Sequence, residues 1–481
     1  MFEANPIVEK VRSQINHPII DSDGHFFEFY PVLNEYLEKE GGKALLEGFY
    51  ASIRETQIDG NWHELSIEQR RDVWRNRPVF WALQAENTLD LATAMLPNLM
   101  YRRLDEIGLD FSIMYPGVGN VAISLPREDV RRASCRAFNR YFADTFCAFA
   151  DRMRPAALVP AHTPAEAVED LEYAVKTMGF KVILFPSYIK RPIAAAVRKD
   201  PAMERYAFRL DTYGIDSDYD YDPLWRKCLE LKVVPTFHSP SDGMFMRNSI
   251  SNYCYNHIGH FAAAGDAVCK SLFLGGVTDR FPQLKFLFLE GGVGWARSLL
   301  ADLIGHWSKR NGEAIQQFDG SKVDRARFLE LYKQFGGSLY RESLSDPLGS
   351  RLNPYEVKDY DDFADCGVRV KQDFIDRFVE PFFFGCEADD PITSSAFDAL
   401  RNPLGARLNA LMGSDISHWD VPDLREVLDE AWEPVEKGQM TLRDFRDFVF
   451  ANPVKLWTAL DPDFFRGTRV EDAVKKAMIS A

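Results

Sequence analysis

The sequence predicts a (β/α)8 barrel of the α/β class, with helical insertions after the first and sixth strands. Eight short apolar runs, rich in Val, Ile, Leu and Phe, recur along the chain, and each is followed by small or polar residues. Such continuous apolar runs are typical of strands buried on both faces. Segments with apolar residues at helical spacing separate the runs, and eight repeats of strand and helix indicate this barrel.

The runs follow one another along the whole chain. They are Ile19–Asp21, Phe111–Pro116, Ala156–Pro160, Lys181–Pro186, Val233–His238, Leu284–Gly292, Phe382–Glu387 and Leu408–Asp415. The helical spacing is clearest in Pro164–Met178 and Asp222–Leu231.

Two intervals between runs are much longer than a single helix requires. Roughly 90 residues separate the first two runs, and a similar number separates the sixth from the seventh. We expect insertions at about 26–108, with helices over 32–46, 66–76 and 87–107, and at about 310–380. Both are expected to leave the carboxyl end of a strand, where barrel loops build active sites, and to act as a lid or an oligomer surface. The barrel domain is predicted over 19–466, with an N-terminal extension at 1–18 and a C-terminal helix at 467–481.

Composition excludes several classes of function. The 481 residues include 46% hydrophobic and 27% charged residues, and the net charge of −15 would repel a phosphate backbone, so nucleic acid is not an expected partner. The N-terminal segment lacks the apolar core of a secretory signal, and the longest apolar stretch is interrupted by charges. Seven cysteines form no C-x-x-C pair. We therefore expect a cytoplasmic protein with reduced thiols and no membrane contact.

Ionisable residues follow five of the predicted strands. Asp21, Asp23 and His25 share one face of an extended segment, and later runs end in or precede a histidine or a carboxylate. These later residues are His238, Glu290, Glu387 and Asp415. Carboxylates gathered at one end of a barrel repel one another, and a divalent cation would neutralise them. Oxygen and imidazole donors without thiolate suit Mn, Fe or Zn.

The motifs around these residues resemble a known family. Ile20–His25, Ile-Asp-Ser-Asp-Gly-His, resembles the opening motif of the amidohydrolase superfamily, in particular its amidohydrolase-2 group. That group contains metal-dependent hydrolases and decarboxylases similar to aminocarboxymuconate semialdehyde decarboxylase. The resemblance runs from about Ile19 to Asp463 and includes Asp220–Trp225, Gly276–Lys285, Glu290–Trp295, Gly413–Asp420 and Asn452–Trp457.

The resemblance implies a ligand set and two departures from it. Asp23, His25, His238 and Asp415 fall on the metal-ligand positions of the group. Asp23 replaces the commoner histidine of the superfamily, which favours a harder ion such as Mn over Zn. Glu290 stands before Gly-Gly where the decarboxylases carry their proton-transfer histidine, so their mechanism does not transfer directly.

Further residues are weaker candidates for the site. Asp415 and Glu290 are the expected bases, and Glu290 is also a candidate metal ligand. His260, or His257 one helical turn before it, is expected to act as an acid or as a ligand of a second metal. His418, Glu387 and Trp295 are expected to contact substrate, although Trp295 equally suits a packing position.

The expected activity is that of a metal-dependent hydrolase acting on a small carboxylate, amide or cyclic substrate, with one or two Mn, Fe or Zn ions per chain. Three alternatives stay open: a non-oxidative decarboxylase of an aromatic or unsaturated acid, a dinuclear iron or manganese oxygenase, and a non-catalytic partner subunit. A homo-oligomer is expected, and a hetero-oligomer is an alternative.

Overall fold

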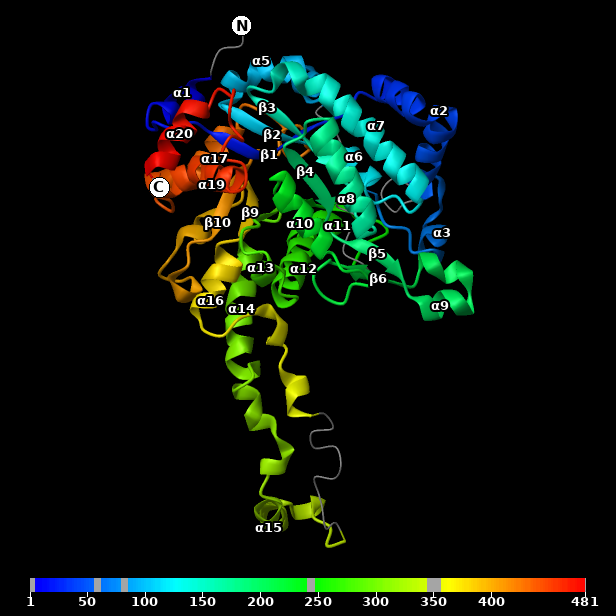
Figure 1. Cartoon of the computed structure of the whole chain (residues 1–481), viewed down its shortest axis with the longest axis vertical. Coiled ribbons are helices and arrows are strands. Elements are labelled where there is room, and N and C mark those ends of the chain that lie inside the picture. Colours follow the sequence, from blue (N-terminus) through cyan, green and yellow to red (C-terminus); the bar gives the residue numbers. More distant parts are fainter. Residues whose placement is uncertain (1–4, 56–61, 79–84, 240–246, 344–355, 481) are drawn as a thin grey trace.

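Eight parallel strands form the centre of the computed structural model, which describes residues 5–55, 62–78, 85–239, 247–343 and 356–480 (Figure 1). Their order in the sheet is β1-β2-β3-β4-β7-β8-β9-β10. The bounds are β1 Ile20–Phe26, β2 Phe111–Pro116, β3 Met153–Leu158, β4 Val182–Pro186, β7 Pro235–His238, β8 Phe286–Phe288, β9 Phe382–Glu387 and β10 Asn409–Gly413. Every strand overlaps one of the eight predicted runs, so the predicted (β/α)8 barrel is confirmed.

The first and last strands meet through backbone hydrogen bonds just beyond β10. The Asp415 N–H donates to the Asp23 carbonyl at 2.9 Å, and the His25 N–H donates to the Ile416 carbonyl at 3.2 Å. These bonds nearly close the barrel, and they join two segments that carry predicted ligands.

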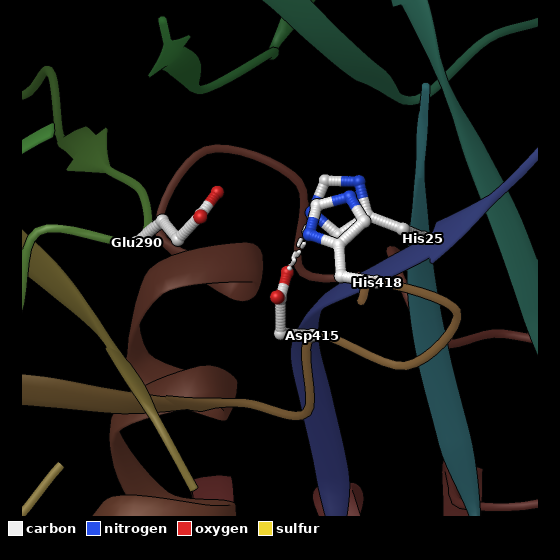
Figure 2. Close-up of side chains that lie close together, drawn as sticks. All are labelled: His25, Glu290, Asp415 and His418. Carbon is white, nitrogen blue, oxygen red and sulfur yellow. Dashed lines mark ion pairs between the residues drawn. The ribbon is translucent and has the colours of Figure 1, made fainter. Parts of the chain in front are cut away.

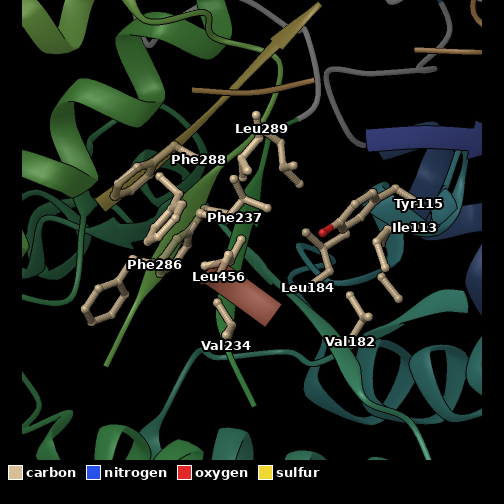
Figure 3. Packing of buried hydrophobic residues seen from close by; sticks show 14 of the residues in the cluster. Ile113, Tyr115, Val182, Leu184, Val234, Phe237, Phe286, Phe288, Leu289 and Leu456 are labelled. Carbon is tan, nitrogen blue, oxygen red and sulfur yellow. The ribbon is translucent and has the colours of Figure 1, made fainter. Parts of the chain in front are cut away.

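The barrel interior is apolar and tightly filled. Ile113, Leu184 and Phe286 each expose 0% of their surface, and Val234 exposes 3% (Figure 3). Each such side chain contributes roughly 1.5–3 kcal/mol of transfer free energy, so the strands are held by packing that does not depend on a ligand at the rim.

Helices surround the strands, and several begin with a side-chain cap. For example, Thr163 accepts a hydrogen bond from the Glu166 N–H, and Pro164 occupies the first helical turn of α8. The helices up to β8 are α1 Pro6–Arg12, α2 Tyr30–Glu55, α3 Ile67–Asp72, α4 Thr88–Met95, α5 Pro97–Ile107, α6 Gly119–Ala122, α7 Glu128–Phe146, α8 Pro164–Glu172, α9 Ala194–Lys199, α10 Asp222–Leu231, α11 Tyr253–His257, α12 His260–Leu274 and α13 Val277–Arg280. Those after β8 are α14 Gly294–Arg310, α15 Arg325–Phe335, α16 Gln372–Phe374, α17 Val427–Glu436, α18 Leu442–Arg446, α19 Asn452–Thr458 and α20 Glu471–Ser480.

The segment inserted after β1 is helical and returns toward the barrel. It contains α2 to α5, and the predicted helix over 87–107 divides at Leu96, whose extended backbone precedes Pro97. The Trp62 indole donates to the Ile250 carbonyl at 2.8 Å, and the Trp74 indole donates to the Asn248 side chain at 2.6 Å. This insertion therefore contacts the segment that follows β7.

The second insertion does not start at the end of a strand, as expected, but after a helix. The chain first runs through α14, about 25 Å long for 17 residues, before the inserted residues begin. They form an arm that projects away from the barrel and carries α15 at its far end (Figure 1). The expectation that this segment leaves directly from the carboxyl end of a strand is wrong, because a complete barrel helix lies between β8 and the arm.

A small antiparallel hairpin was not predicted from the sequence. It consists of β5 Ile189–Pro192 and β6 Phe208–Asp211, with α9 between them. Arg191 bonds both Asp211 and the Tyr221 hydroxyl, which ties the hairpin to the start of α10. All seven cysteines are free, and no described helix has the length and apolar character needed to span a membrane.

Candidate metal centre

Predicted ligands from several strand ends converge at one place. His25, Glu290, Asp415 and His418 point toward one another (Figure 2), and each offers a ligand atom within 4.8 Å of the others. Asp23, His25 and His238 form a second group by the same distance. His25 belongs to both groups, so the two lie side by side at the carboxyl end of the barrel.

Short distances connect the members of the two groups. His25 Nε2 lies 3.3 Å from Asp23 Oδ1 and 3.2 Å from Asp415 Oδ1. His238 Nε2 lies 2.9 Å from Glu290 Oε2. His418 Nδ1 lies 2.6 Å from Asp415 Oδ1, and its ring stacks on that of His25 with centroids 3.8 Å apart.

The backbone is bent to present these side chains. Glu290 and Asp415 have φ angles of 58° and 47°, in the left-handed region that residues with a Cβ rarely adopt. Such strain persists where the surrounding structure holds it, and it is concentrated at functional sites. The register between β1 and β2 also shifts between Asp21 and Gly24, where a Cβ on Gly24 would lie 2.5 Å from Asp21 Oδ2.

Asp21 supports the segments that carry the candidate ligands through hydrogen bonds. Its carboxylate accepts from the Ser112 hydroxyl at 2.5 Å and from the Ser414 N–H and hydroxyl at 2.9 and 2.8 Å. Burial raises the pKa of Asp21 to about 6, although these donors oppose the rise. The residue links β1, β2 and the end of β10, so it positions its neighbour Asp23.

The protonation state of His238 is set by its neighbours. Its Nδ1 lies 3.1 Å from the Ser239 carbonyl, to which an N–H at this position donates, and 3.0 Å from the side-chain amide of Asn120. The structure has the Asn120 amide nitrogen facing Nδ1; with the amide rotated by 180°, Oδ1 and the Ser239 carbonyl would both accept from Nδ1–H. Burial lowers the pKa of His238 to about 4, so its Nε2 keeps a lone pair for a cation at neutral pH.

The electrostatics of the centre favour a cation. Burial, followed by repulsion from neighbouring carboxylates, raises the pKa values of Glu290, Asp415 and Glu387 well above the usual range. For Glu290 the neighbours are Asp415 and Glu387. The three groups together contain five carboxylates and three histidines. A divalent cation would supply the missing positive charge.

The donor atoms also fit a metal ion. Several buried atoms of these side chains make no hydrogen bond within the described part of the chain. They are Asp23 Oδ1, both ring nitrogens of His25, His238 Nε2, and both carboxylate oxygens of Glu290 and of Asp415. Orphaned buried polar atoms are costly unless something else binds them. Imidazole and carboxylate ligands without thiolate suit Mn, Fe or Zn.

A third group adjoins the first two. Glu387, Asp415 and Asp420 bring one oxygen each within 4.8 Å of one another, and His257 Nε2 lies 3.7 Å from Asp420 Oδ2. Asp415 therefore belongs to two groups at once. Sequence reasoning assigned no role to Asp420 or Asn120, although the spacing of Asp415, His418 and Asp420 on one loop was a usable signal.

Two of the weaker candidates lie beside the three groups instead of within them. His260 is buried, and its Nε2 lies 2.9 Å from the hydroxyl of Ser239, the residue after His238. The Trp295 ring packs edge-on against Phe288 and Phe384, with centroids 5.8 and 5.3 Å apart, which is a packing environment.

Comparison with known proteins identifies the family. The sequence model of the amidohydrolase family matches residues 20–338, more than half of the chain. The chain belongs to the amidohydrolase family. The match covers the first six strands of the barrel and the candidate ligands Asp23, His25, His238 and Glu290.

Three solved structures are similar to this amidohydrolase at low sequence identity. A 2,6-dihydroxybenzoate decarboxylase bound to 2,6-dihydroxybenzoate is 14% identical, with a TM-score of 0.48, and the match covers 92% of this chain and 100% of that one. An amidohydrolase from Mycobacterium avium subsp. paratuberculosis is 15% identical, with a TM-score of 0.48 and coverages of 92% and 100%. A 5-carboxyvanillate decarboxylase from Novosphingobium aromaticivorans, complexed with manganese, is 12% identical, with a TM-score of 0.49 and coverages of 95% and 98%.

We expect about one to two Mn, Fe or Zn ions per chain in protein purified without chelator. Because the carboxyls of Glu290 and Asp415 hold protons more tightly than usual in the metal-free site, metal binding should release protons at pH 7. Affinity should then fall as the pH is lowered. Elemental analysis and calorimetric metal titration in buffers of different ionisation enthalpy measure both effects. Less than about 0.1 ion per chain, with no uptake on titration, would contradict the assignment.

Proposed function

We propose that this protein is a metal-dependent hydrolase that acts on a small organic substrate through a metal-activated water. The observation that carries the proposal is Glu290, whose carboxylate lies 2.9 Å from His238 Nε2 and belongs to the same group as His25 and Asp415. A carboxylate in this position suits a ligand or a base, whereas an imidazole, which can carry a proton near neutral pH, would suit protonation of a carbanion.

The roles divide among the residues by their environment. Asp23, His25 and His238 would hold the cation, and Glu290 would complete the ligand set or act as a base. A bound Mn, Fe or Zn ion would acidify a water molecule and polarise the substrate carbonyl. Asp415 would accept the proton that this water loses, because its carboxylate lies within the ligand group.

His418 supports proton transfer from Asp415. Its Nδ1 lies 2.6 Å from Asp415 Oδ1. Burial, followed by the nearby imidazoles, lowers the pKa of His418 well below its usual value, so the ring is neutral at pH 7. A neutral ring with Nδ1–H toward Asp415 would hold that carboxylate in one orientation, and Asp415, after taking the proton of the water, would deliver it to the leaving group. Glu387, which shares a group with Asp415 and Asp420, would contact substrate.

A second candidate is a dinuclear iron or manganese centre, which would also permit oxygen chemistry. It is favoured by Asp415, which shares one group with His25 and Glu290 and another with Glu387 and Asp420. A carboxylate has two oxygens and is able to bridge two cations. Two ions per chain, reduced to one by Glu387→Gln, would support this candidate, whereas one ion in both proteins would exclude it.

Product analysis separates hydrolysis from decarboxylation. With a panel of small amides, esters, lactones and hydroxybenzoates in water enriched in oxygen-18, we expect one heavy oxygen in the acid product and no carbon dioxide. Carbon dioxide release without incorporation would replace the hydrolase proposal with a carboxy-lyase. A chelator-treated sample serves as the control, because a metal-independent reaction would not arise from this centre.

A further inference from the structure

Glu28 is a buried carboxylate to which the proposed mechanism gives no part. It lies two residues after the end of β1 and three after the candidate ligand His25, and 1% of its surface is exposed. Its two carboxylate oxygens accept hydrogen bonds from the backbone N–H groups of Val118 and Gly119, at 3.0 and 2.9 Å. A carboxylate that leaves water loses its hydration, and hydrogen bonds from the protein compensate for that loss. Breaking these two bonds is therefore costly, and Glu28 holds the turn after β2 in place.

The turn held by Glu28 also lies close against the end of β1. The Gly117 N–H donates to the carbonyl of Phe26, the last residue of β1, at 3.1 Å. A Cβ atom on Gly119 would lie 3.1 Å from Glu28 Oε1, so a side chain at this position would push the turn away from the carboxylate. The turn is therefore anchored to β1, and α6 begins from it.

Asn120, the second residue of α6, connects this anchored turn to the metal centre. It is 6% exposed, and its side-chain amide lies 3.0 Å from Nδ1 of His238, the last residue of β7. The amide oxygen, Oδ1, makes no hydrogen bond within the described part of the chain. Most side-chain hydrogen bonds in proteins go to the backbone or to water, so a buried amide directed at a candidate ligand indicates a positioning role.

The aromatic neighbours of His238 do not decide which way its ring faces. Phe261 and His25 both pack edge-on against it, with centroids 5.4 and 5.2 Å apart. A ring turned by 180° would keep this packing but would exchange each nitrogen for a carbon, and such torsions are broad and roughly two-fold. A hydrogen bond at Nδ1 distinguishes the two orientations. Asn120 supplies this contact from another strand end, beside the adjacent Ser239 carbonyl at 3.1 Å.

We infer that Asn120, held in place by Glu28, is a positioning residue that fixes the His238 ring with Nε2 available to a cation. When Nε2 binds a cation, Nδ1 carries the hydrogen, and the Asn120 amide accepts it through Oδ1. The inference rests on the proposed function for the role of His238 as a metal ligand. It goes further by coupling three strand ends at that ligand, because Glu28 follows β1, Asn120 follows β2 and His238 ends β7.

The test is calorimetric titration of the full, chelator-treated chain with Mn²⁺. Asn120→Leu keeps the approximate size of the side chain and removes the hydrogen bond, and it should weaken Mn²⁺ binding about 10- to 100-fold. Asn120→Asp keeps an acceptor oxygen in the same place and should retain most of the affinity. Glu28→Gln should weaken binding less than Asn120→Leu does. The double variant should bind as Asn120→Leu alone, because Glu28 acts through Asn120.

A second measurement observes the ring of His238 directly. In chelator-treated protein with nitrogen-15-labelled histidine, the signals of His238 are assigned by their absence from His238→Ala, and they report which ring nitrogen carries hydrogen. The unaltered protein should carry hydrogen on Nδ1, whereas Asn120→Leu should show a mixture of the two ring forms. An asparagine that only supports the fold would leave these signals unchanged.

A matched control replaces a buried asparagine at the other end of the barrel. Asn409 begins β10, is 5% exposed and donates to the carbonyls of Val379 and Phe382 at 2.6 and 3.0 Å, so Asn409→Leu should bind Mn²⁺ as the unaltered protein does. Unchanged Mn²⁺ affinity and unchanged His238 signals in Asn120→Leu would overturn the inference. Weakened binding in a protein that hydrolyses no substrate would support the inference and reject the hydrolase, whereas hydrolysis with unchanged affinity would reject the inference alone.

Discussion

His238→Ala should lose nearly all bound metal and at least about a thousandfold of the metal-dependent rate, while the fold remains intact. A ring nitrogen of His238 lies within 4.8 Å of the ligand atoms of Asp23 and His25, so its removal opens the proposed ligand set. The barrel should survive because Phe237 and its neighbours remain buried, independently of a ligand at the rim. Elemental analysis, turnover and far-ultraviolet circular dichroism measure the three effects.

Two further variants calibrate this result. His306 is exposed on α14, and its ring lies 2.7 Å from the Asp302 carbonyl of the same helix, so His306→Ala should keep metal and rate. Asp415→Asn should lower the rate more than the metal content if Asp415 is also the base. If Asp415→Asn and His238→Ala lose metal and rate equally, Asp415 is only a ligand. A His238→Ala protein that keeps its full metal content would contradict the assignment of the centre.

Glu290→Gln should reduce the rate by about a hundredfold or more with little change in size or packing. The carboxylate is 7% exposed and lies 2.9 Å from His238 Nε2, so the amide keeps the volume but loses the charge and the basicity. Loss of rate with unchanged metal would identify a base, and loss of one of two ions would identify a bridging ligand. Metal counting beside single-turnover kinetics distinguishes these outcomes.

The same variant tests the choice between hydrolysis and decarboxylation. Burial and the charges of Asp415 and Glu387 raise the pKa of Glu290 well above its ordinary value in the metal-free protein, and a cation in the centre acts in the opposite direction. If Glu290→Gln keeps its metal and at least about half its rate, Glu290 is structural. The argument that places hydrolysis above decarboxylation would then lose its basis. Glu380→Gln, a change on a half-exposed carboxylate paired with Lys455, is the matched control.

The barrel strands were predictable because a strand buried on both faces must be apolar along its length. Phe111–Pro116 and Phe382–Glu387 match β2 and β9 at both ends. The helix at Asp222–Leu231 was equally clear, since its apolar residues follow helical spacing. The hairpin of β5 and β6 was missed because its strands are short and half-exposed, and their pairing depends on Arg191 and Asp211, which lie 20 residues apart.

The sequence by itself determined the barrel, its family and the ligand candidates at the strand ends, because these depend on local patterns of burial and on residue types at fixed positions. Only the tertiary structure decided that Asp415 joins two groups of ligands and that Asn120 contacts His238. It also decided that Glu28 holds the turn before Asn120 and that the second insertion projects away from the barrel. These relations join side chains far apart in the chain, and their geometry depends on how the barrel closes and how its helices end, which no local pattern encodes.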